Sequence, residues 1–248
     1  MVKRGAHVFI ILIILFVYGV LVNFASTPKN KLQQQKNNAP VVKIIAPKNK
    51  SQFDWNTQLN YSITVSDKED GESKYDEINT KEVLLEVKYI GDDSKIPQAL
   101  SKRVVNDPPG LTSIRTSNCF NCHAFNSKSI GPSFYDIKKK YKTTPENVSL
   151  LVKRTREGST GIWGNASMPT HPELTKDETK KMVEWILKNA ESNSSYYIGA
   201  EGSFRIKPTG ASQKKAVYML TASYTDHGVK DSSKQHLKGQ DVIFIHSK

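Results

Sequence analysis

The chain has 248 residues, 37% of them hydrophobic and 24% charged, with 14 glycines and 11 prolines. This composition excludes a disordered or collagen-like chain, and two cysteines are too few for a disulfide-stapled scaffold or a four-cysteine zinc site. The net charge of +12 is spread along the chain without interleaved aromatic residues, so we expect solvated faces or a surface for an acidic protein partner, not a nucleic-acid site.

The N-terminus carries a predicted export signal. Lys3 and Arg4 precede an almost wholly apolar run from Val8 to Val22. A basic segment before such a run is typical of a signal whose positive end stays in the cytoplasm. We expect residues 1–25 to be a signal peptide or an uncleaved N-terminal hydrophobic helix that anchors the chain. Asn23, where cleavage needs a small side chain, favours the anchor. Either form would place the remainder on the periplasmic side of the bacterial inner membrane or in the soluble periplasm.

The next stretch changes from a polar tether to a β-rich pattern. Residues 26–39 contain Leu32 as their one large aliphatic side chain and predict a flexible linker. Residues 40–103 alternate apolar and polar side chains between turn residues, which indicates the first half of a β-sandwich. The predicted strands cover residues 41–46, 59–66 and 83–90.

Residues 119–123 read Cys-Phe-Asn-Cys-His, the C-x-x-C-H pattern of covalent haem attachment. Two thiols one helical turn apart can each add to a vinyl group of one haem, and the next histidine can place its imidazole beneath the iron. A thioredoxin-like redox pair would need a strand–helix setting, whereas Gly110–Ala124 reads as a helix end. A zinc site would need two further soft ligands at metal spacing. We therefore expect one haem c, attached through Cys119 and Cys122, with His123 as the proximal ligand.

A second axial ligand is expected downstream of His123. Met168 lies in a glycine-rich loop and is followed by proline, whereas Met182 and Met219 fit a helix and a strand pattern and suit a hydrophobic core. A thioether on haem iron raises the reduction potential. We expect His123 and Met168 to bind the iron, with His171 as an alternative ligand that would make the site bis-histidine.

The stretch from Cys119 to about Ala190 resembles the small bacterial class I cytochromes c. The matching segments are CFNCHAFNSKSIGPSFYDIKKKY and EGSTGIWGNASMPTHPELTKDETKKMVEWIL. The resemblance implies an all-α haem domain, which we place over residues 104–192, and a carbonyl of Pro132 that accepts the N–H of the proximal histidine. It also implies that Trp163 lines the haem pocket near a propionate.

Apolar spacing within this segment agrees with helices. Residues 133–142 and 145–156 show helical periodicity, and Thr175 with Glu178 forms a capping box that opens the last helix. The spacing that follows predicts an apolar stripe that packs on the first helix and serves as core rather than as a cofactor site. The stripe contains Met182, Trp185, Ile186 and Asn189, with Leu111 and Ile114 as its expected partners.

Residues 193–248 repeat the β pattern, with strands predicted over 203–206, 216–225 and 241–246. Each flank alone is marginal for a core, whereas the two together approach an immunoglobulin-like β-sandwich. They resemble the opening and closing strands of PKD or cadherin-like modules, in VKIIAPKNKSQF and VYMLTASYTDHG. We expect an α+β multidomain chain with the cytochrome c domain inserted in, or flanked by, this sandwich. Two separate small β domains are the alternative.

An acidic turn follows the second predicted strand. Asp67, Glu69 and Asp70 could bind calcium, as acidic turns do in cadherin-like modules, or form a polar turn closed by Gly71. The sequence favours the polar turn.

These features indicate a periplasmic monohaem cytochrome c that carries single electrons and is not an enzyme. No motif for nucleophilic, zinc-protease or phosphate-loop chemistry occurs. We expect redox partner proteins, such as a dehydrogenase, an oxidase or a membrane electron-transfer complex, and no nucleic acid. Two alternatives stay open. The chain could be an electron-accepting docking module for a separate quinoprotein sugar or alcohol dehydrogenase, or a haem sensor or enzyme if the distal side of the iron is open.

Overall fold

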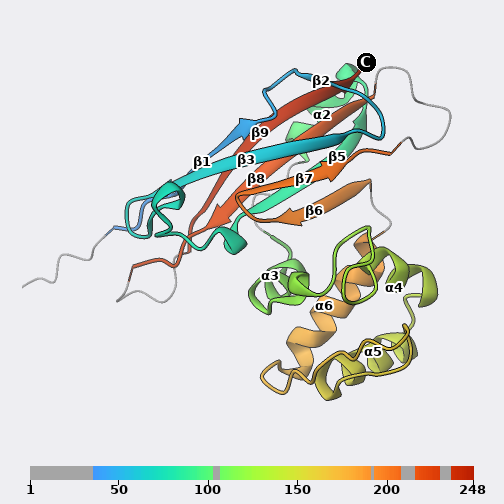
Figure 1. The fold of residues 1–248 in the computed structure, drawn as a ribbon. Coiled ribbons are helices and arrows are strands. Elements are labelled where there is room, and N and C mark those ends of the chain that lie inside the picture. Colours follow the sequence, from blue (N-terminus) through green and yellow to red (C-terminus); the bar gives the residue numbers. More distant parts are fainter. Residues whose placement is uncertain (1–35, 103–106, 191–192, 208–215, 230–235) are drawn as a thin grey trace, which may run out of the picture. The chain divides into compact units, whose positions relative to one another are not determined.

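The computed structural model describes residues 36–102, 107–190, 193–207, 216–229 and 236–248. Strands precede and follow a helical segment that holds the two cysteines (Figure 1). The predicted signal peptide or anchor over residues 1–25 lies outside the described residues. Among the helices that the structure does describe, none combines the length and the hydropathy needed to cross a bilayer.

The strands form two sheets, and each sheet combines strands from before and after the helical segment. In one sheet β1 (Val41–Ala46) pairs with β3 (Gln58–Asp67), which also pairs with β4 (Gly71–Glu72) and β7 (Glu201–Arg205). The other sheet has the order β2 (Gln52–Phe53), β9 (Lys238–Ser247), β8 (Val217–Thr225), β5 (Leu84–Gly91) and β6 (Ser194–Ile198). The pairs are antiparallel except for β2 with β9. The chain therefore leaves both sheets for the helical segment and returns to both.

Alternation within the strands directs one face of each sheet into a shared hydrophobic core. In β3, Tyr61, Ile63 and Val65 are buried while the residues between them are partly or fully exposed. The central strand β8 is buried on both faces, which explains its nearly continuous apolar sequence. The shared core includes Val42, Tyr61, Ile63, Val65, Phe204, Leu85, Val87, Tyr218, Leu220, Ala222, Tyr224, Ile243 and Ile245. The immunoglobulin-like class of these two sheets stays a prediction.

The six predicted strands are present with shifts of a few residues at their ends, and three further strands join them. Two of the additional strands, β2 and β4, have two residues each. The third, β6, has the sequence Ser-Ser-Tyr-Tyr-Ile, whose adjacent tyrosines hide the alternation. Tyr197 packs against the core of the sheets, whereas Tyr196 packs against the helical segment. The two tyrosines therefore serve opposite faces of one edge strand.

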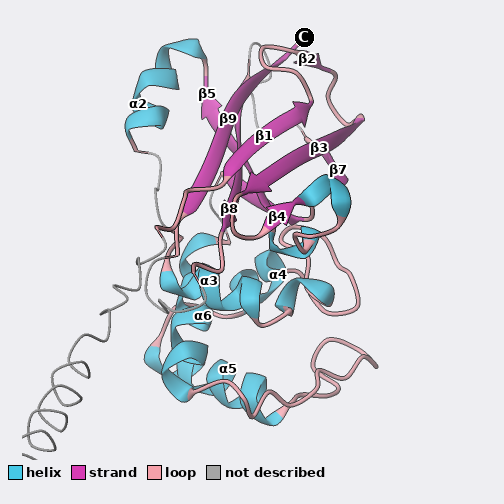
Figure 2. Cartoon of the chain, turned by 90° about the vertical axis from the view of Figure 1, so that its left-hand side faces the viewer, coloured by secondary structure: helices cyan, strands magenta, loops and turns pink. Residues whose placement is uncertain are grey.

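The helical segment contains α3 (Pro109–Thr116), α4 (Phe134–Lys140), α5 (Pro145–Glu157) and α6 (Lys176–Asn189), which Figure 2 shows gathered together. The predicted capping box is confirmed, because the Thr175 hydroxyl accepts the Glu178 N–H and the Glu178 carboxylate accepts the Thr175 N–H. A short helix, α2 (Ile96–Ser101), lies in the first β flank and was not expected.

Helices α3 and α6 pack closely because a glycine stands where they cross. A Cβ on Gly110 would lie 2.4 Å from the carbonyl oxygen of Lys181, so this position admits no larger residue without separating the helices. Leu111 and Ile114 lie in one cluster with Met182 and Trp185, as the apolar spacing predicts. The same cluster includes Leu84 of β5 and the partly buried Tyr196 and Ile198 of β6, so the core of the helical segment continues onto the sheets.

A residue of the predicted linker and the predicted acidic turn both make specific side-chain hydrogen bonds. Asn37, within the predicted linker, is 6% exposed, and its side-chain amide donates to Asp226. In the turn, Asp67 accepts the N–H groups of Glu69 and Asp70, and the Asp70 carboxylate accepts the Tyr224 hydroxyl. Over the described part of the chain, no group of three His, Cys, Asp or Glu side chains is placed to hold a metal ion.

Candidate haem-binding site

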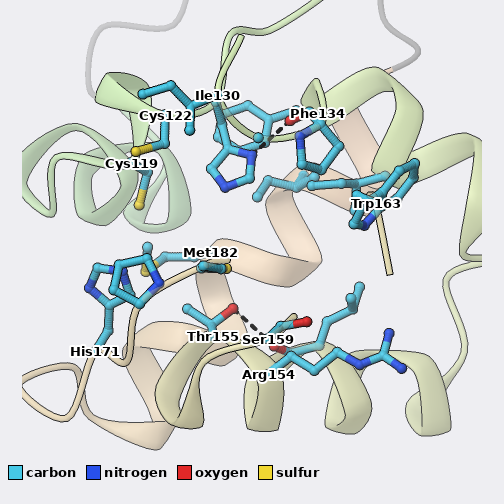
Figure 3. Close-up of a pocket in the computed structure, with 18 of the residues that line it drawn as sticks. Cys119, Cys122, Ile130, Phe134, Arg154, Thr155, Ser159, Trp163, His171 and Met182 are labelled. Atoms are coloured by element: carbon cyan, nitrogen blue, oxygen red, sulfur yellow. Dashed lines mark hydrogen bonds between the residues drawn. The ribbon is translucent and has the colours of Figure 1, made fainter. Parts of the chain in front are cut away.

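A largely apolar cavity of about 320 Å³ lies within the helical segment (Figure 3). Its wall contains Cys119, Cys122, His123, Trp163 and Met168, five of the six site residues expected from the sequence. The sixth, Pro132, also lines the cavity. The structure thus brings together residues that are spread over about 50 positions of the sequence.

The two cysteines lie in a turn just after α3. Cys119–Asn121 form a single 3₁₀ turn, and the N–H groups of Cys122 and His123 both donate to the Cys119 carbonyl, at 3.2 and 2.9 Å. This compact turn presents both thiols and the imidazole to the same cavity. Burial raises the pKa of the Cys119 thiol to about 11, which keeps it neutral at physiological pH. No disulfide joins the two thiols, so both can form thioether bonds.

His123 is buried, and its ring is fixed from one side. Its Nδ1 lies 2.7 Å from the carbonyl oxygen of Pro132, and its ring stacks on Phe134 with centroids 5.6 Å apart. A neutral imidazole that donates from Nδ1 to a carbonyl keeps its lone pair on Nε2, the tautomer that can bind a metal. Burial, and the charge of His171 to a smaller extent, lower the pKa of His123 and favour this neutral form, although the Pro132 carbonyl acts in the opposite direction.

The loop before Pro132 reaches this position because residue 131 is glycine. A Cβ on Gly131 would lie 2.6 Å from Cε1 and 2.9 Å from Nδ1 of His123. The N–H of Gly131 donates to the Cys122 carbonyl at 2.9 Å, which closes the loop over the histidine ring. Any larger residue would displace the imidazole or the loop that orients it.

Met168 is held in place by a short backbone pairing with Ser159, which lies just after the C-terminal end of α5. Its N–H donates to the Ser159 carbonyl at 2.8 Å, and the Ser159 N–H donates back to the Met168 carbonyl at 3.1 Å. Gly158 precedes this pairing with φ +83°, a conformation that few other residues adopt. The loop is therefore fixed at the point where Met168 enters the cavity wall.

The polar side of the cavity includes a basic residue that the sequence analysis did not single out. Arg154 lines the cavity together with Thr155, and its guanidinium donates to the Tyr141 hydroxyl at 2.6 Å. Near it, the Lys140 ammonium lies 4.7 Å from the centroid of the Trp163 ring (Figure 3 shows Arg154 and Trp163). The sequence hint that Arg154 lies near the cavity is its spacing of one helical turn from Leu150 and Leu151. Only the folded chain shows which face of α5 it occupies.

The prediction that the stripe on α6 is core alone is wrong in part. Met182 and Ile186 belong to the core cluster, but both also line the cavity, as does Val183. The spacing correctly identified a buried face of α6, and part of that face lines the cavity. An apolar helix face packed against a cofactor has the same periodicity as one packed against other helices.

The residues fit a haem. A buried neutral imidazole faces a largely apolar cavity that also holds two reduced thiols and a thioether, the donor set of a c-type haem. Arg154 supplies a positive group that could pair with a haem propionate.

Comparison with known proteins agrees with this fit. A family model described as cytochrome c matches residues 109–190. Cytochrome c-552 of Hydrogenobacter thermophilus is 33% identical over 73 residues, which is 29% of this chain and 74% of that protein. Cytochrome c2 of Rubrivivax gelatinosus is 40% identical over 74 residues, which is 29% of this chain and 87% of that protein.

Among solved structures, the crystal structure of Nitrosomonas europaea cytochrome c552 is 30% identical, with a TM-score of 0.30, over 31% of this chain and 95% of that one. The strands before and after the helical segment lie outside the region matched by the family model. The chain belongs to the cytochrome c family as a class I member, and its cofactor is one haem c bound covalently through Cys119 and Cys122.

Proposed function

We propose that this protein is a periplasmic electron carrier whose haem iron is bound by His123 and Met168. The observation that carries the proposal is the presence of both side chains in the wall of the cavity that holds the cysteine pair. With both axial positions filled by protein atoms, no position would be open for a substrate or a gas. An electron carrier that is not an enzyme fits this arrangement better than a sensor does.

The bound haem supplies a single site that gains or loses one electron. The chain contributes four things to that step. Cys119 and Cys122 tie the group to the turn after α3, and His123 binds through Nε2 while the Pro132 carbonyl holds its ring orientation. Met168 provides a thioether that favours the reduced form and so raises the potential.

The cavity walls supply the fourth contribution, which is the exclusion of water. Met182, Val183 and Ile186 of α6 present apolar side chains to the cavity, and Ile137 and Leu151 do so from α4 and α5. A rigid, dry environment limits the rearrangement that accompanies a change of charge. The same walls favour the form with less net charge, which adds to the effect of the thioether.

The partner that the surface fits best is an acidic redox protein. Lys139 and Lys140 at the end of α4, followed by Lys142, place positive charge beside Trp163 at the cavity wall. Complementary charge accelerates the encounter of redox partners and is screened by salt. A dehydrogenase, an oxidase or a membrane electron-transfer complex with an acidic face would satisfy this requirement.

We propose that residues 104–192 are a haem domain inserted into one immunoglobulin-like domain made of residues 40–103 and 193–248. The pairing of β5 with β6 and β8, and of β3 with β7, supports a single split domain over two separate ones. Residues 1–25 would direct the chain to the periplasm and would either be removed or remain as an anchor.

Optical spectra of Met168→Leu test the ligand assignment. The oxidised wild type should show the weak long-wavelength band of a ferric haem with a thioether ligand, and Met168→Leu should lack it. Met219→Leu is the matched control, because Met219 is buried in β8 outside the cavity. If the wild type lacks the band and its reduced form binds carbon monoxide, the iron has an open position. The protein would then be a sensor or an enzyme and not an electron carrier.

The partner proposal is tested separately by charge reversal. Lys139→Glu with Lys142→Glu should slow electron transfer to a small acidic blue-copper protein at low salt, and the difference should vanish at high salt. Lys81→Glu, on an exposed turn of the first β flank, is the control. Equal rates for the double variant and the wild type at low salt would show that these lysines do not take part in partner recognition.

A further inference from the structure

A second histidine lies in the wall of the haem cavity and is not explained by the proposed ligand pair. His171 lines the cavity three residues after Met168, and Figure 3 shows it on the side of the cavity below Cys119. Its side chain is 23% exposed, so most of the ring is enclosed by protein.

The hydrogen bonding of His171 repeats that of His123. The Nδ1 of His171 lies 2.9 Å from Oε1 of Glu173, just as the Nδ1 of His123 lies 2.7 Å from the Pro132 carbonyl. An imidazole that donates from Nδ1 keeps its lone pair on Nε2, and a carboxylate acceptor strengthens the ring as a base. Both histidines of the cavity are therefore held in the tautomer that can bind iron.

The backbone keeps His171 at the same end of the cavity as Met168. The His171 N–H donates to the Arg156 carbonyl at 3.1 Å, and Met168 is paired with Ser159, so both residues are attached to the C-terminal end of α5. The Glu173 side chain is 62% exposed and can follow the imidazole if the ring turns. A change of ligand would thus need side-chain rotation rather than refolding of the loop.

An ordinary surface ion pair explains these observations less well. Lys153 with Glu157 and Lys181 with Asp177 are such pairs, and in each of them both side chains are at least half exposed. His171 differs because its ring is mostly enclosed and contributes to the cavity wall.

We propose that His171 is a reserve axial ligand, which binds the haem iron through Nε2 whenever Met168 does not. This proposal rests on the proposed function, because it assumes that Met168 is the resident ligand. The exchange is a substitution in which one iron–sulfur bond breaks and one iron–nitrogen bond forms, with no electron gained or lost. An imidazole in place of the thioether lowers the reduction potential, so the exchange would switch the carrier to a low-potential state.

Spin state and midpoint potential of a variant series test this inference. Met168→Leu preserves side-chain volume and should give a six-coordinate low-spin ferric haem with a lower potential than the wild type. Met168→Leu/His171→Ala should be predominantly high-spin, and added imidazole should restore the low-spin spectrum. Met168→Leu/His227→Ala is the matched control, because His227 is 60% exposed and does not line the cavity.

The possible outcomes distinguish a failure of the His171 role from a failure of the Met168 assignment. A high-spin Met168→Leu, or a low-spin Met168→Leu/His171→Ala, would overturn the role of His171 and leave the carrier unaffected. A wild type that already lacks the thioether band would instead overturn the ligand assignment on which the inference rests. Met168→Leu/Glu173→Gln adds a second readout, since removing the carboxylate charge should raise the potential of Met168→Leu without changing its spin state.

Discussion

The carbonyl oxygen of Pro132 lies 2.7 Å from Nδ1 of His123, and this contact sets the chemistry of the site. It leaves Nε2 as the atom that can bind iron, and it fixes the plane of the ring. The contact depends on the residue before the proline, because a side chain at position 131 would occupy the space of the imidazole.

Gly131→Ala should therefore impair haem binding. The added Cβ would lie 2.6 Å from Cε1 of His123, and relieving the overlap should cost about 1–3 kcal/mol. We expect a lower haem-to-protein ratio in the purified protein and a shifted midpoint potential, because the imidazole that binds the iron would be displaced. Ser127→Ala, in the same loop but exposed, should leave both measurements unchanged. An unaltered midpoint potential in fully loaded Gly131→Ala would show that the loop adapts without moving the ring.

A buried ionic cluster joins the helical segment to the sheets and yields a second prediction. Asp107 accepts hydrogen bonds from Arg115 of α3 and Lys238 of β9, and all three side chains are 8–9% exposed. Arg115 also donates to the backbone carbonyl of Glu82. Asp107→Ala would leave two buried cations without their carboxylate, at a cost of about 3–5 kcal/mol. Denaturant unfolding at neutral pH measures this loss.

The control for this experiment is Asp177→Ala, which removes an exposed carboxylate paired with Lys181 on α6. Surface pairs of that kind contribute little, so its unfolding midpoint should stay near that of the wild type. Equal midpoints for the two variants would mean that water reaches the Asp107 cluster and replaces the missing carboxylate.

Much of the site could be predicted because its signals are local in the sequence. The two cysteines and His123 occupy five consecutive positions, and the capping box at Thr175 marks where the last helix begins. The Met168 assignment used the loop around it, and the roles of Pro132 and Trp163 came from the family resemblance. Each of these features is contained within one short segment.

The remainder depends on contacts between distant segments. Arg154 is one of many basic residues spread along the sequence, and only the fold shows that it lies in the cavity wall. The stripe residue Ile186 has the periodicity of core, and sequence cannot separate packing against a helix from packing against a cofactor. Strand β6 was missed because five residues with adjacent tyrosines carry no clear alternation, although both of its faces are covered in the fold.

Tyr61 gives a prediction for alkaline stability. Burial, with a smaller effect from the charge of Tyr197, raises the pKa of Tyr61 from 10.0 to about 12. The unfolded chain therefore releases this proton at a lower pH than the folded protein does. The stabilising contribution is fully present below pH 10 and is lost as the pH rises toward 12, by up to about 2 kcal/mol.

Tyr61→Phe should remove this part of the pH dependence. At neutral pH the variant loses only the hydrogen bond to the Ile198 carbonyl, which is long at 3.4 Å. Urea midpoints measured between pH 8 and pH 11 should then fall less steeply than in the wild type, approximately in proportion to the proton release on unfolding that is removed. Tyr75→Phe, at an exposed position, should follow the wild-type slope, and an equal slope for Tyr61→Phe would assign the alkaline loss to other groups.

The last prediction concerns the aromatic contact between β6 and the helical segment. The ring of Tyr196 lies 5.1 Å from that of Phe125 and 5.5 Å from that of Trp185, and Phe125 in turn contacts Phe134, on which His123 stacks. Tyr196→Ala would open a cavity beside these rings and should cost about 2–4 kcal/mol. Because the lost packing adjoins the proximal side of the haem, the thermal loss of the haem spectrum should shift to lower temperature together with the loss of β structure. Tyr75→Ala is the exposed control. If the haem spectrum of Tyr196→Ala melts at the wild-type temperature while the β signal melts earlier, the helical segment does not depend on the sheets for its stability.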